Sequence, residues 1–363
     1  MTEFELKSKK IQDLMEHHHL NALVLRQVGN FAWATCGASS YVNMAATNGA
    51  SSLLITPSAR YVITDNIEAS RLKQEEHLEE QGWEFHITPW YETNQAVTQL
   101  THSLNLGADY PHPGAVDLSA EFSQLRSALG PEEGKRFRKL SGLCAEAMDQ
   151  AIRSVRPKMT EYQIAGLLAD AVQSRGIQPI VNLIATDERI FRFRHPLPTD
   201  QKLNQYAMLI VCGRKWGLVC SLTRLVYFGR LPDELQHKAE AVAHVDARLI
   251  IATRPGRKLC DVFNDATQAY RGQGFADEWQ LHHQGGPVGY EPREFLATPT
   301  SDNVVSVGQV FAWNPSITGV KSEDTILIGR ERNEVLTSIS GWPTMKVSLD
   351  GQEIERPAIL EIN

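Results

Sequence analysis

The chain has 363 residues, of which 42% are hydrophobic and 22% are charged, as expected for a globular protein long enough for two domains. Its net charge of −7 and the lack of a long basic run argue against nucleic acid as a partner. The sequence has no hydrophobic signal core and no stretch of about 18 apolar residues, so we expect a cytoplasmic protein that does not bind membranes.

Residues 1–128 alternate strand-like and helix-like segments, which predicts an α/β layer domain. The expected elements are buried strands at 20–25, 50–56 and 60–64, a charged surface helix at 65–80 and a second helix at 119–129. We place the domain boundary just before Gly130-Pro131. The run His17-His18-His19 does not predict a metal site, because three consecutive side chains of a helix point in different directions.

Residues 129–350 contain the same order of elements twice. Each half opens with a proline and two acidic residues, which is typical of a helix N-terminus, and then reaches an Arg-Pro pair. A second predicted helix follows and ends at a glycine 20 residues after that arginine, from Arg156 to Gly176 and from Arg254 to Gly274. Hairpin patterns then close the halves, at 206–228 and 310–328. The repeat predicts a pseudo-twofold α+β domain with its ligand site between the halves, and it leaves 351–363 as a C-terminal tail.

The order of these elements, together with Val155-Arg-Pro-Lys-Met-Thr-Glu161, resembles the pita-bread fold of the aminopeptidase P, prolidase and creatinase superfamily. The preceding domain is similar to the creatinase/prolidase N-terminal domain, so the resemblance covers nearly the whole chain. It implies a homodimer that acts on a small-molecule or short-peptide substrate. The metallopeptidases of this superfamily hold two divalent ions with two aspartates, one histidine and two glutamates.

Matching the sequence to this pattern indicates that most of the metal ligands have been replaced. The five ligand positions are occupied here by Val211, Ser221, His283, Asn314 and Glu323. Leu222 in place of Ser221 and His282 in place of His283 stay open, because each match can shift by one residue. One carboxylate, one amide and one imidazole do not neutralise two divalent cations, and hard cations need several oxygen ligands. We therefore expect no metal ion and no other cofactor.

Creatinase is the informative relative, since it has this fold and hydrolyses a C–N bond without metal. His195 matches its histidine before the first hairpin, and Tyr290-Glu-Pro-Arg-Glu294 resembles a Tyr-Tyr-Gly-Arg-Glu stretch in creatinase. The match ends at Thr223 and Asn314, which stand where creatinase has glutamates. Creatine is therefore not expected as the substrate, because a guanidinium cation needs carboxylates around it.

The main hypothesis is a metal-independent hydrolase of a small-molecule or dipeptide-like C–N bond. Its expected catalytic residues are His195, His283 and Glu323, with His195 acting first as base and then as acid. The residues expected to bind substrate are His282, Thr223, Arg224, Arg293, Glu294 and Asn314, with Arg192 and Arg194 as further candidates for holding a carboxylate. Two alternatives stay open, a non-catalytic ligand-binding or regulatory protein and an Xaa-Pro peptidase with a single unusual metal site.

Overall fold

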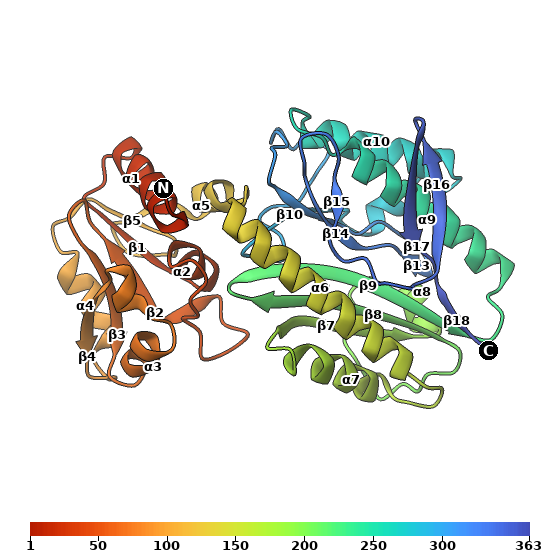
Figure 1. Cartoon of the computed structure of the whole chain (residues 1–363), viewed down its shortest axis with the longest axis horizontal. Coiled ribbons are helices and arrows are strands. Elements are labelled where there is room, and N and C mark those ends of the chain that lie inside the picture. The colour runs from red at the N-terminus through yellow and green to blue at the C-terminus, as the bar shows by residue number, and fades with distance from the viewer. The chain divides into compact units, whose positions relative to one another are not determined.

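The computed structural model describes all 363 residues except the side chains at positions 93 and 94, and the chain divides into two compact units (Figure 1). The first unit comprises Met1–Arg126 with Trp216–Leu218, and the second comprises Ser127–Lys215 with Val219–Asn363. The boundary predicted after residue 128 differs from this division by two residues.

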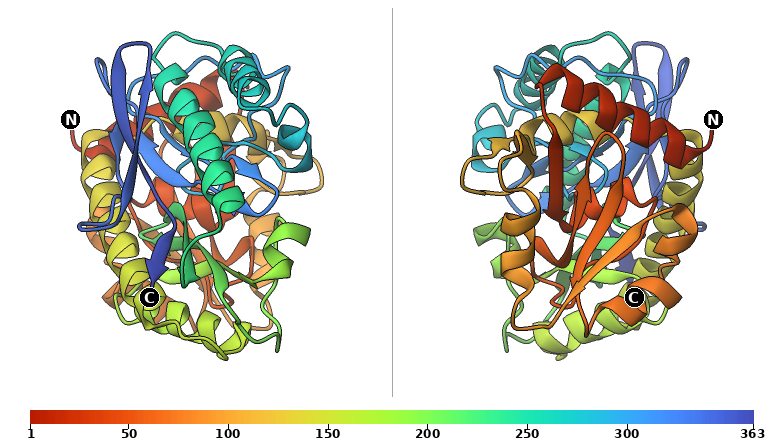
Figure 2. Two further views of the ribbon diagram at one scale, coloured as in Figure 1. Left: turned by 90° about the vertical axis from the view of Figure 1, so that its right-hand side faces the viewer. Right: turned by 90° about the vertical axis from the view of Figure 1, so that its left-hand side faces the viewer.

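The first unit is built on a six-stranded sheet with the strand order β4-β3-β2-β1-β5-β6. Its strands are β1 (Ala22–Gln27), β2 (Asn48–Ile55), β3 (Arg60–Asp65), β4 (Glu84–Thr88), β5 (Leu106–Ala108) and β6 (Val116–Asp117). Its helices are α1 (Glu3–His17), α2 (Val28–Ala34), α3 (Ala69–Gln74), the 3₁₀ helix η1 (Leu78–Gln81), α4 (Thr93–Leu100) and α5 (Ser119–Arg126). The right-hand view of Figure 2 shows this sheet with α1 next to it. The three strands predicted for this part of the chain are confirmed.

The single helix predicted over 65–80 is wrong. Only α3 and the short η1 form there, and His77 between them has a left-handed backbone with φ of +52°. Such a conformation ends an α-helix, because it breaks the run of right-handed residues. The carboxylate of Asp65 also accepts hydrogen bonds from the backbone of Ile67 and Glu68, which fixes a turn where the helix was expected to begin.

The second unit confirms the predicted duplication. Its helices are α6 (Pro131–Ser154), α7 (Glu161–Gln173), α8 (Glu188–Arg192), α9 (Asp233–Ala252), α10 (Leu259–Gly272) and the 3₁₀ helix η2 (Glu278–Leu281). One sheet has the order β18-β9-β8-β7, formed by β7 (Gln178–Thr186), β8 (Tyr206–Lys215), β9 (Leu218–Phe228) and β18 (Leu360–Ile362). The other has the order β10-β11-β14-β15, formed by β10 (Gly285–Val288), β11 (Val310–Trp313), β14 (Asp324–Leu327) and β15 (Glu334–Val335). Two hairpins complete the unit, β12 (Ser316–Ile317) with β13 (Val320–Lys321) and β16 (Thr344–Leu349) with β17 (Gln352–Pro357).

Helix pairs cover these sheets and bury one large core. Helices α6 and α7 pack with β7 and β8, and α9 lies beside the β16–β17 hairpin (Figure 2, left). The core contains side chains from both sheets, including Met208, Ile210, Phe311 and Ile326, together with apolar residues of α9 and α10. The two halves of the repeat are thereby joined, and the loops at their junction carry the polar residues of interest.

The prediction of a C-terminal tail at 351–363 is wrong. Residues 352–357 form β17, and β18 pairs in parallel with β9, with Leu360 opposite Val226. Ile359 and Leu360 are buried, which explains why this segment is ordered against the sheet.

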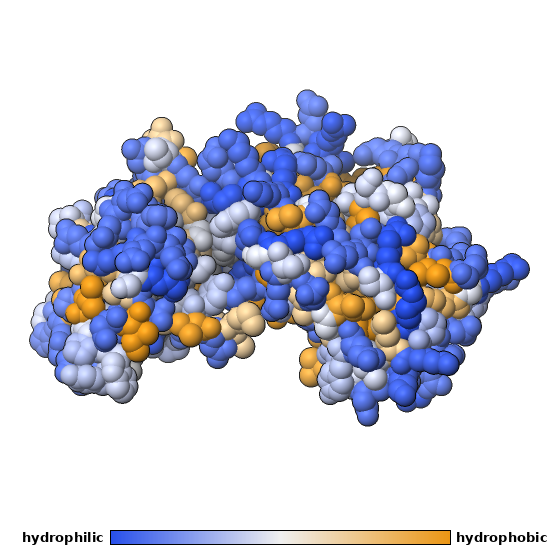
Figure 3. Space-filling view, turned by 60° about the horizontal axis from the view of Figure 1, so that its bottom comes forward, coloured by the Kyte–Doolittle hydropathy of each residue, from blue (hydrophilic) through white to orange (hydrophobic). Residues whose placement is uncertain are grey.

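No helix in the part of the chain that the structure describes is long and apolar enough to cross a membrane. In Figure 3, hydrophilic residues cover much of the visible face, and hydrophobic residues lie among them in small groups.

Candidate functional site

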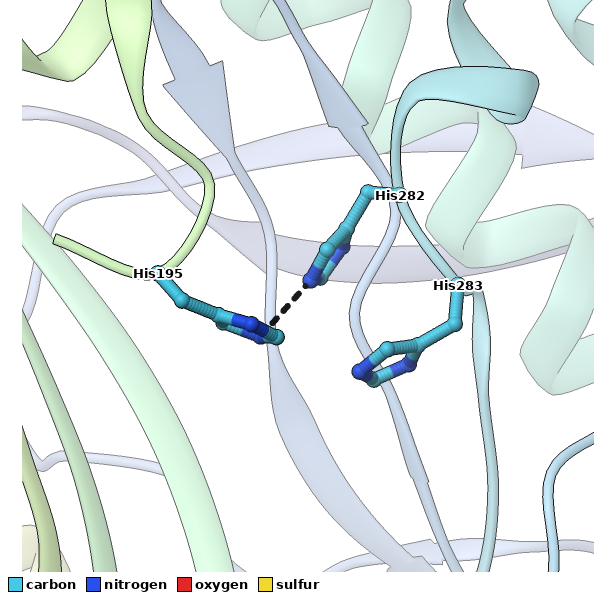
Figure 4. Close-up of side chains that lie close together, drawn as sticks. All are labelled: His195, His282 and His283. Carbon is cyan, nitrogen blue, oxygen red and sulfur yellow. Dashed lines mark hydrogen bonds between the residues drawn. The ribbon is translucent and has the colours of Figure 1, made fainter.

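Three histidines from two loops meet in the second unit (Figure 4). His195 lies in the loop between α8 and β8, whereas His282 and His283 lie between η2 and β10. The Nε2 atoms of His195 and His282 are 3.1 Å apart, within hydrogen-bonding distance. The nearest ring nitrogens of all three residues lie within 4.8 Å of one another. The structure thus brings both His282 and His283 to His195, and the one-residue choice between them does not arise.

The loop that carries His195 is held by the first residue of α7. The carboxylate of Glu161 is buried and accepts hydrogen bonds from the backbone and hydroxyl of Thr186 and of Thr199, at 2.8–3.0 Å. It also pairs with Arg189 of α8. Because Thr186 ends β7 and Thr199 lies four residues after His195 within the loop, Glu161 ties the loop to β7 and α7. This network explains the local role of the Val155–Glu161 segment.

A second ion pair joins the two histidine-bearing loops. The guanidinium of Arg194 donates to Glu278 of η2 at 2.9 Å and to the hydroxyl of Thr318 at 3.0 Å. Since η2 leads directly into His282, this contact sets the distance between the loops. Arg192, by contrast, pairs with Glu188 one helical turn away, and both side chains are largely exposed. Both arginines thus have carboxylate partners within the protein.

Glu323 is buried beside two cations. Its carboxylate accepts a hydrogen bond from the hydroxyl of Thr223 at 2.5 Å. It is also 2.9 Å from the ammonium of Lys321 and 3.2 Å from the guanidinium of Arg293. The side chains of Glu323 and Lys321 are 3% and 5% exposed, so water screens this group of charges only weakly.

These contacts decide the charge of Glu323. Burial alone would raise the pKa of the carboxyl group, but Lys321 and Arg293, with the hydrogen bond from Thr223, lower the pKa of Glu323 to about 2. Glu323 is therefore an anion at neutral pH, and its single negative charge faces two positive ones.

The same surroundings keep the histidines neutral. Burial and then Lys321 lower the pKa of His282 to about 2, and burial and then Arg293 lower the pKa of His283 to about 4. Burial, with Lys321 next in importance, also lowers the pKa of His195. At pH 7 each ring therefore has one nitrogen lone pair that can accept a proton or bind a cation.

Glu323, Lys321 and Arg293 are called the charged group below. Strand β8 presents Cys212, and not Val211, to this group. The hydroxyl of Ser221 on β9 donates to the thiol sulfur of Cys212 at 3.1 Å. Successive side chains of a strand point to opposite faces, so Val211 points away from Ser221. Val211 pairs across the sheet with Asn182, whose amide bonds to the backbone of α7 on that other face. This corrects the expectation that Val211 lines the site.

The turn between β8 and β9 supplies the signal that would have identified Cys212. Trp216 and Gly217 form a two-residue turn with φ values of +54° and +74°, as in a type I′ hairpin. Such a turn places Lys215 opposite Leu218, and counting back along both strands places Cys212 opposite Ser221. Burial, with Glu323 next in importance, raises the pKa of Cys212 to about 11, so the residue is a neutral thiol.

Ser221 and Thr223 contact Arg293 and Glu323. The hydroxyl of Ser221 accepts a hydrogen bond from Arg293 at 3.5 Å, which favours Ser221 over the alternative Leu222. Asn314 is buried directly after β11, and its side-chain oxygen has no hydrogen-bond partner among the described residues. None of these three side chains supplies a negative charge.

Two residues expected to bind substrate have structural partners instead. Arg224 is buried, and its guanidinium donates to Asp324 at 2.8 Å and to the carbonyl of Thr337 at 3.0 Å. This corrects its assignment to a substrate carboxylate. The carboxylate of Glu294 accepts a hydrogen bond from the backbone of Tyr290, which fixes the turn that carries Arg293. Glu294 is thus a positioning residue.

Lys321 is a site residue that was not predicted, although the sequence carries a signal for it. Lys321 and Glu323 are two residues apart in an extended segment, and side chains at this spacing share a face. Only the acidic member of the pair was considered, because the comparison concerned metal ligands.

Comparison with known proteins identifies the architecture. The sequence model of metallopeptidase family M24 matches residues 135–330, more than half of the chain. An uncharacterized peptidase of Staphylococcus aureus (strain MW2) is 27% identical over 238 residues, which are 62% of this chain and 66% of the relative. The chain thus spans just under two thirds of the length of this relative.

Several solved structures share the fold. The prolidase of Pyrococcus horikoshii OT3 has a TM-score of 0.80 at 18% identity, over 92% of this chain and 98% of the other. An Xaa-Pro dipeptidase from Bacillus anthracis has a TM-score of 0.77 at 16% identity, over 99% and 100%. The N-terminal domain of the FACT complex subunit SPT16 from chickpea has a TM-score of 0.69 at 16% identity, over 93% and 97%. At these identities the likeness shows the fold alone.

Proposed function

The chain belongs to metallopeptidase family M24, and from this premise we propose a peptidase-like hydrolase that cleaves a small-molecule or dipeptide-like C–N bond without the family's pair of divalent ions. The proposal includes a homodimer, for which the resemblance to prolidase and creatinase is the support.

The observation that carries this proposal is the pairing of Glu323 with Lys321 and Arg293. One negative charge and two positive charges leave a net charge of +1 before any metal ion is added. The neighbouring Cys212 and Asn314 add no charge that would offset it. Two divalent cations need several anionic oxygen ligands, so the residues present do not fit a dinuclear centre.

His195 is the proposed base. Its contact with His282 through the two Nε2 atoms requires one ring to donate and the other to accept. When His195 donates from Nε2, its Nδ1 lone pair is available to take a proton from an attacking water molecule. The water oxygen bonds to the carbon of the scissile group, the C–N bond breaks, and the protonated imidazole returns its proton to the leaving nitrogen. His282 thus acts by selecting the tautomer of His195.

The charged group has a separate part in the reaction. Lys321 and Arg293 are held in place by Glu323, and their excess positive charge stabilises negative charge that develops on the substrate oxygen. His283 lies beside both His195 and His282 and positions the scissile group. This arrangement supplies by fixed cations the electrostatic stabilisation that metal ions supply elsewhere.

The test is turnover of dipeptides, including Xaa-Pro dipeptides, by purified protein before and after treatment with a chelator. We expect hydrolysis that the chelator does not diminish. His195→Ala should lower kcat by about 10²–10⁴-fold with little change in substrate affinity, because it removes the group that transfers protons. His244→Ala is the matched control, since His244 is a half-buried histidine of α9 outside the cluster.

Two results would replace this proposal. Cleavage that the chelator abolishes, with stoichiometric metal in the purified protein, would make the chain a metal-dependent Xaa-Pro peptidase. Tight binding of dipeptides without turnover, unchanged in His195→Ala, would make it a non-catalytic binding protein.

A further inference from the structure

We propose that His195, His282 and His283 form a binding site for a single borderline divalent cation such as Zn²⁺, and that this cation inhibits the enzyme. The ligands are three neutral imidazoles from two loops, so the site differs in chemistry from a pair of ions held by carboxylates, and only His283 is shared with the five family ligand positions. The binding step stands on the geometry alone, whereas the inhibition rests on the proposed function.

The distances suit three nitrogen ligands of one ion. Nitrogens bound tetrahedrally to zinc at about 2.0–2.1 Å lie roughly 3.3 Å from one another. The Nε2 atoms of His195 and His282 are already 3.1 Å apart, and no pair of ligand atoms is separated by more than 4.8 Å. Figure 4 shows the three rings directed toward a common point.

A second observation also indicates a ligand at this place. The Nδ1 atoms of His282 and His283 are buried and have no hydrogen-bond partner among the described residues. A buried polar atom without a partner is costly, so such atoms call for an explanation. A cation held by Nε2 of His195 and His282 and by Nδ1 of His283 would give the last of these atoms a partner.

The ligand set also selects the class of metal. Imidazole nitrogens suit zinc, copper and nickel, whereas magnesium and calcium require oxygen ligands. Three protein ligands leave a fourth position, and the exposed side of His195 leaves that position open to water or to a small ligand.

The neighbouring charges make the bound ion exchangeable. Lys321 and Arg293 oppose a cation at the histidines, and Glu323 offsets only one of these two charges. Affinity should therefore be lower than in a permanent structural zinc site, and the ion should come and go with its concentration. While bound to Nε2 of His195, the ion leaves the proton of this neutral ring on Nδ1, so Nδ1 can no longer accept a proton from water.

The experiment titrates metal-free protein with Zn²⁺ in a calorimeter and with Co²⁺ by visible absorption, which reports four-coordinate geometry. We expect one ion per chain and no comparable binding of Mg²⁺. His195→Ala and His283→Gln should each weaken Zn²⁺ binding by at least roughly 100-fold, beyond the 10–100-fold typical of losing an outer partner of a ligand. Hydrolysis by the unaltered protein should fall in proportion to the fraction of sites filled.

Two matched controls separate this site from other histidines. His244→Ala removes a histidine of α9, and His18→Gln interrupts the run at the end of α1, where the rings of His17 and His18 are in contact. Both variants should bind Zn²⁺ as the unaltered protein does. Circular dichroism of each variant verifies that it is folded.

Three outcomes would overturn the inference. Zn²⁺ binding that is absent, or that is lost in His18→Gln but kept in His195→Ala, removes the site and leaves the proposed hydrolysis untouched. Zn²⁺ binding at the three histidines that raises turnover removes the inhibitory role and the metal-independent mechanism together. Preference for Mg²⁺ over Zn²⁺ would show that oxygen ligands hold the ion.

Discussion

Lys321 shows how a single side chain changes the chemistry open to a buried carboxylate. A free carboxylate at the position of Glu323 would be an anionic ligand for a hard cation. With the ammonium of Lys321 at 2.9 Å and Arg293 on its other side, the same carboxylate is already neutralised. Lys321 therefore makes the carboxylate of Glu323 a weaker ligand for a hard cation than a free carboxylate would be.

Removing Lys321 should show how much the buried charge of Glu323 depends on this lysine for its stability. Lys321→Met leaves Glu323 buried with Arg293 and Thr223 only, and we expect a loss of about 2–4 kcal/mol in the free energy of unfolding. Glu323→Gln in the same chain should recover part of that loss, with a coupling of at least about 1 kcal/mol. Urea denaturation of both single variants and the double variant measures it.

Lys346→Met is the control, because Lys346 pairs with Glu353 in an exposed hairpin, and it should leave the unfolding midpoint nearly unchanged. Additive losses in the double variant would show that Lys321 does not stabilise the charge of Glu323.

The orientation of β8 predicts that an aspartate destabilises the protein more at position 211 than at position 212. Val211→Asp places a carboxylate on the face toward α7, and we expect a loss of about 4 kcal/mol or more, because the charge is buried without a partner. Cys212→Asp places its carboxylate among Arg293, Lys321 and Ser221, and should cost clearly less. Thermal unfolding of the two variants compares them. Equal losses, or a smaller loss for Val211→Asp, would mean that the two side chains face the other way.

At the scale of secondary-structure elements, Glu161 connects α7 to the loop that bears His195. Its carboxylate accepts from Thr186 at the end of β7 and from Thr199 within that loop, so one buried anion holds the loop against β7 and α7. Neutral glutamine presents an NH₂ group to some of these donors. We expect Glu161→Gln to lose about 2–3 kcal/mol of stability and to lower kcat more than it changes KM, because His195 is no longer held in place.

Glu161→Gln has a natural control in Glu188→Gln, which removes an exposed carboxylate of α8 next to the same loop. That change should have little effect on stability or on kcat. If Glu161→Gln lowers stability while kcat is unaltered, Glu161 supports the fold and does not position His195.

Lowering the pH should reduce the stability that Glu161 contributes by holding the loop that bears His195. Burial acts to raise the pKa of Glu161, but the hydrogen bonds from Arg189, Thr199 and Thr186 outweigh it, and the folded pKa lies below the usual value. A depressed carboxyl pKa contributes stability that is fully present above the unfolded pKa of about 4.3 and is lost as the pH falls through the folded pKa. Urea midpoints at pH 7 and pH 3.5 should therefore show a smaller difference between Glu161→Gln and the unaltered protein at the lower pH. A difference that stays constant would mean that this carboxyl group does not titrate with unfolding.

At the scale of the whole molecule, features that repeat along the chain were the most predictable. The duplicated helices and hairpins follow from hydrophobic periodicity and from the proline and glycine residues at helix ends, all of which are local. The failures have local and distant causes. The left-handed His77 divided a predicted helix. In the predicted tail, β18 forms by pairing with β9, more than 130 residues away, whereas β17 pairs with the neighbouring β16.

Predictions of the site were limited in the same way, because they could not include contacts between residues that are distant in the sequence. His195, Ser221, Thr223, Asn314 and Glu323 were predicted as site residues from their places in motifs. What the sequence could not show was which side chains meet, because Arg293, Lys321 and Glu323 converge only through the packing of separate strands and loops. The choice between Val211 and Cys212 depended on counting from a two-residue turn, so an error of one residue reversed the face.

Deletion of β18, the last strand of the second unit, tests how much this strand stabilises the sheet that it joins. Strand β18 adds to the free edge of β9, the backbone of Gly229 donates to Ile362 at 2.9 Å, and Glu361 accepts from the backbone of Leu231. Deleting Leu360–Asn363 removes these bonds and one buried leucine, for an expected loss of about 2–4 kcal/mol. Hydrogen exchange should show faster exchange at 226–231 while the sheet of the first unit keeps its protection. Deleting Asn363 alone should change neither, and faster exchange in both units after the longer deletion would mean that they unfold as one cooperative body.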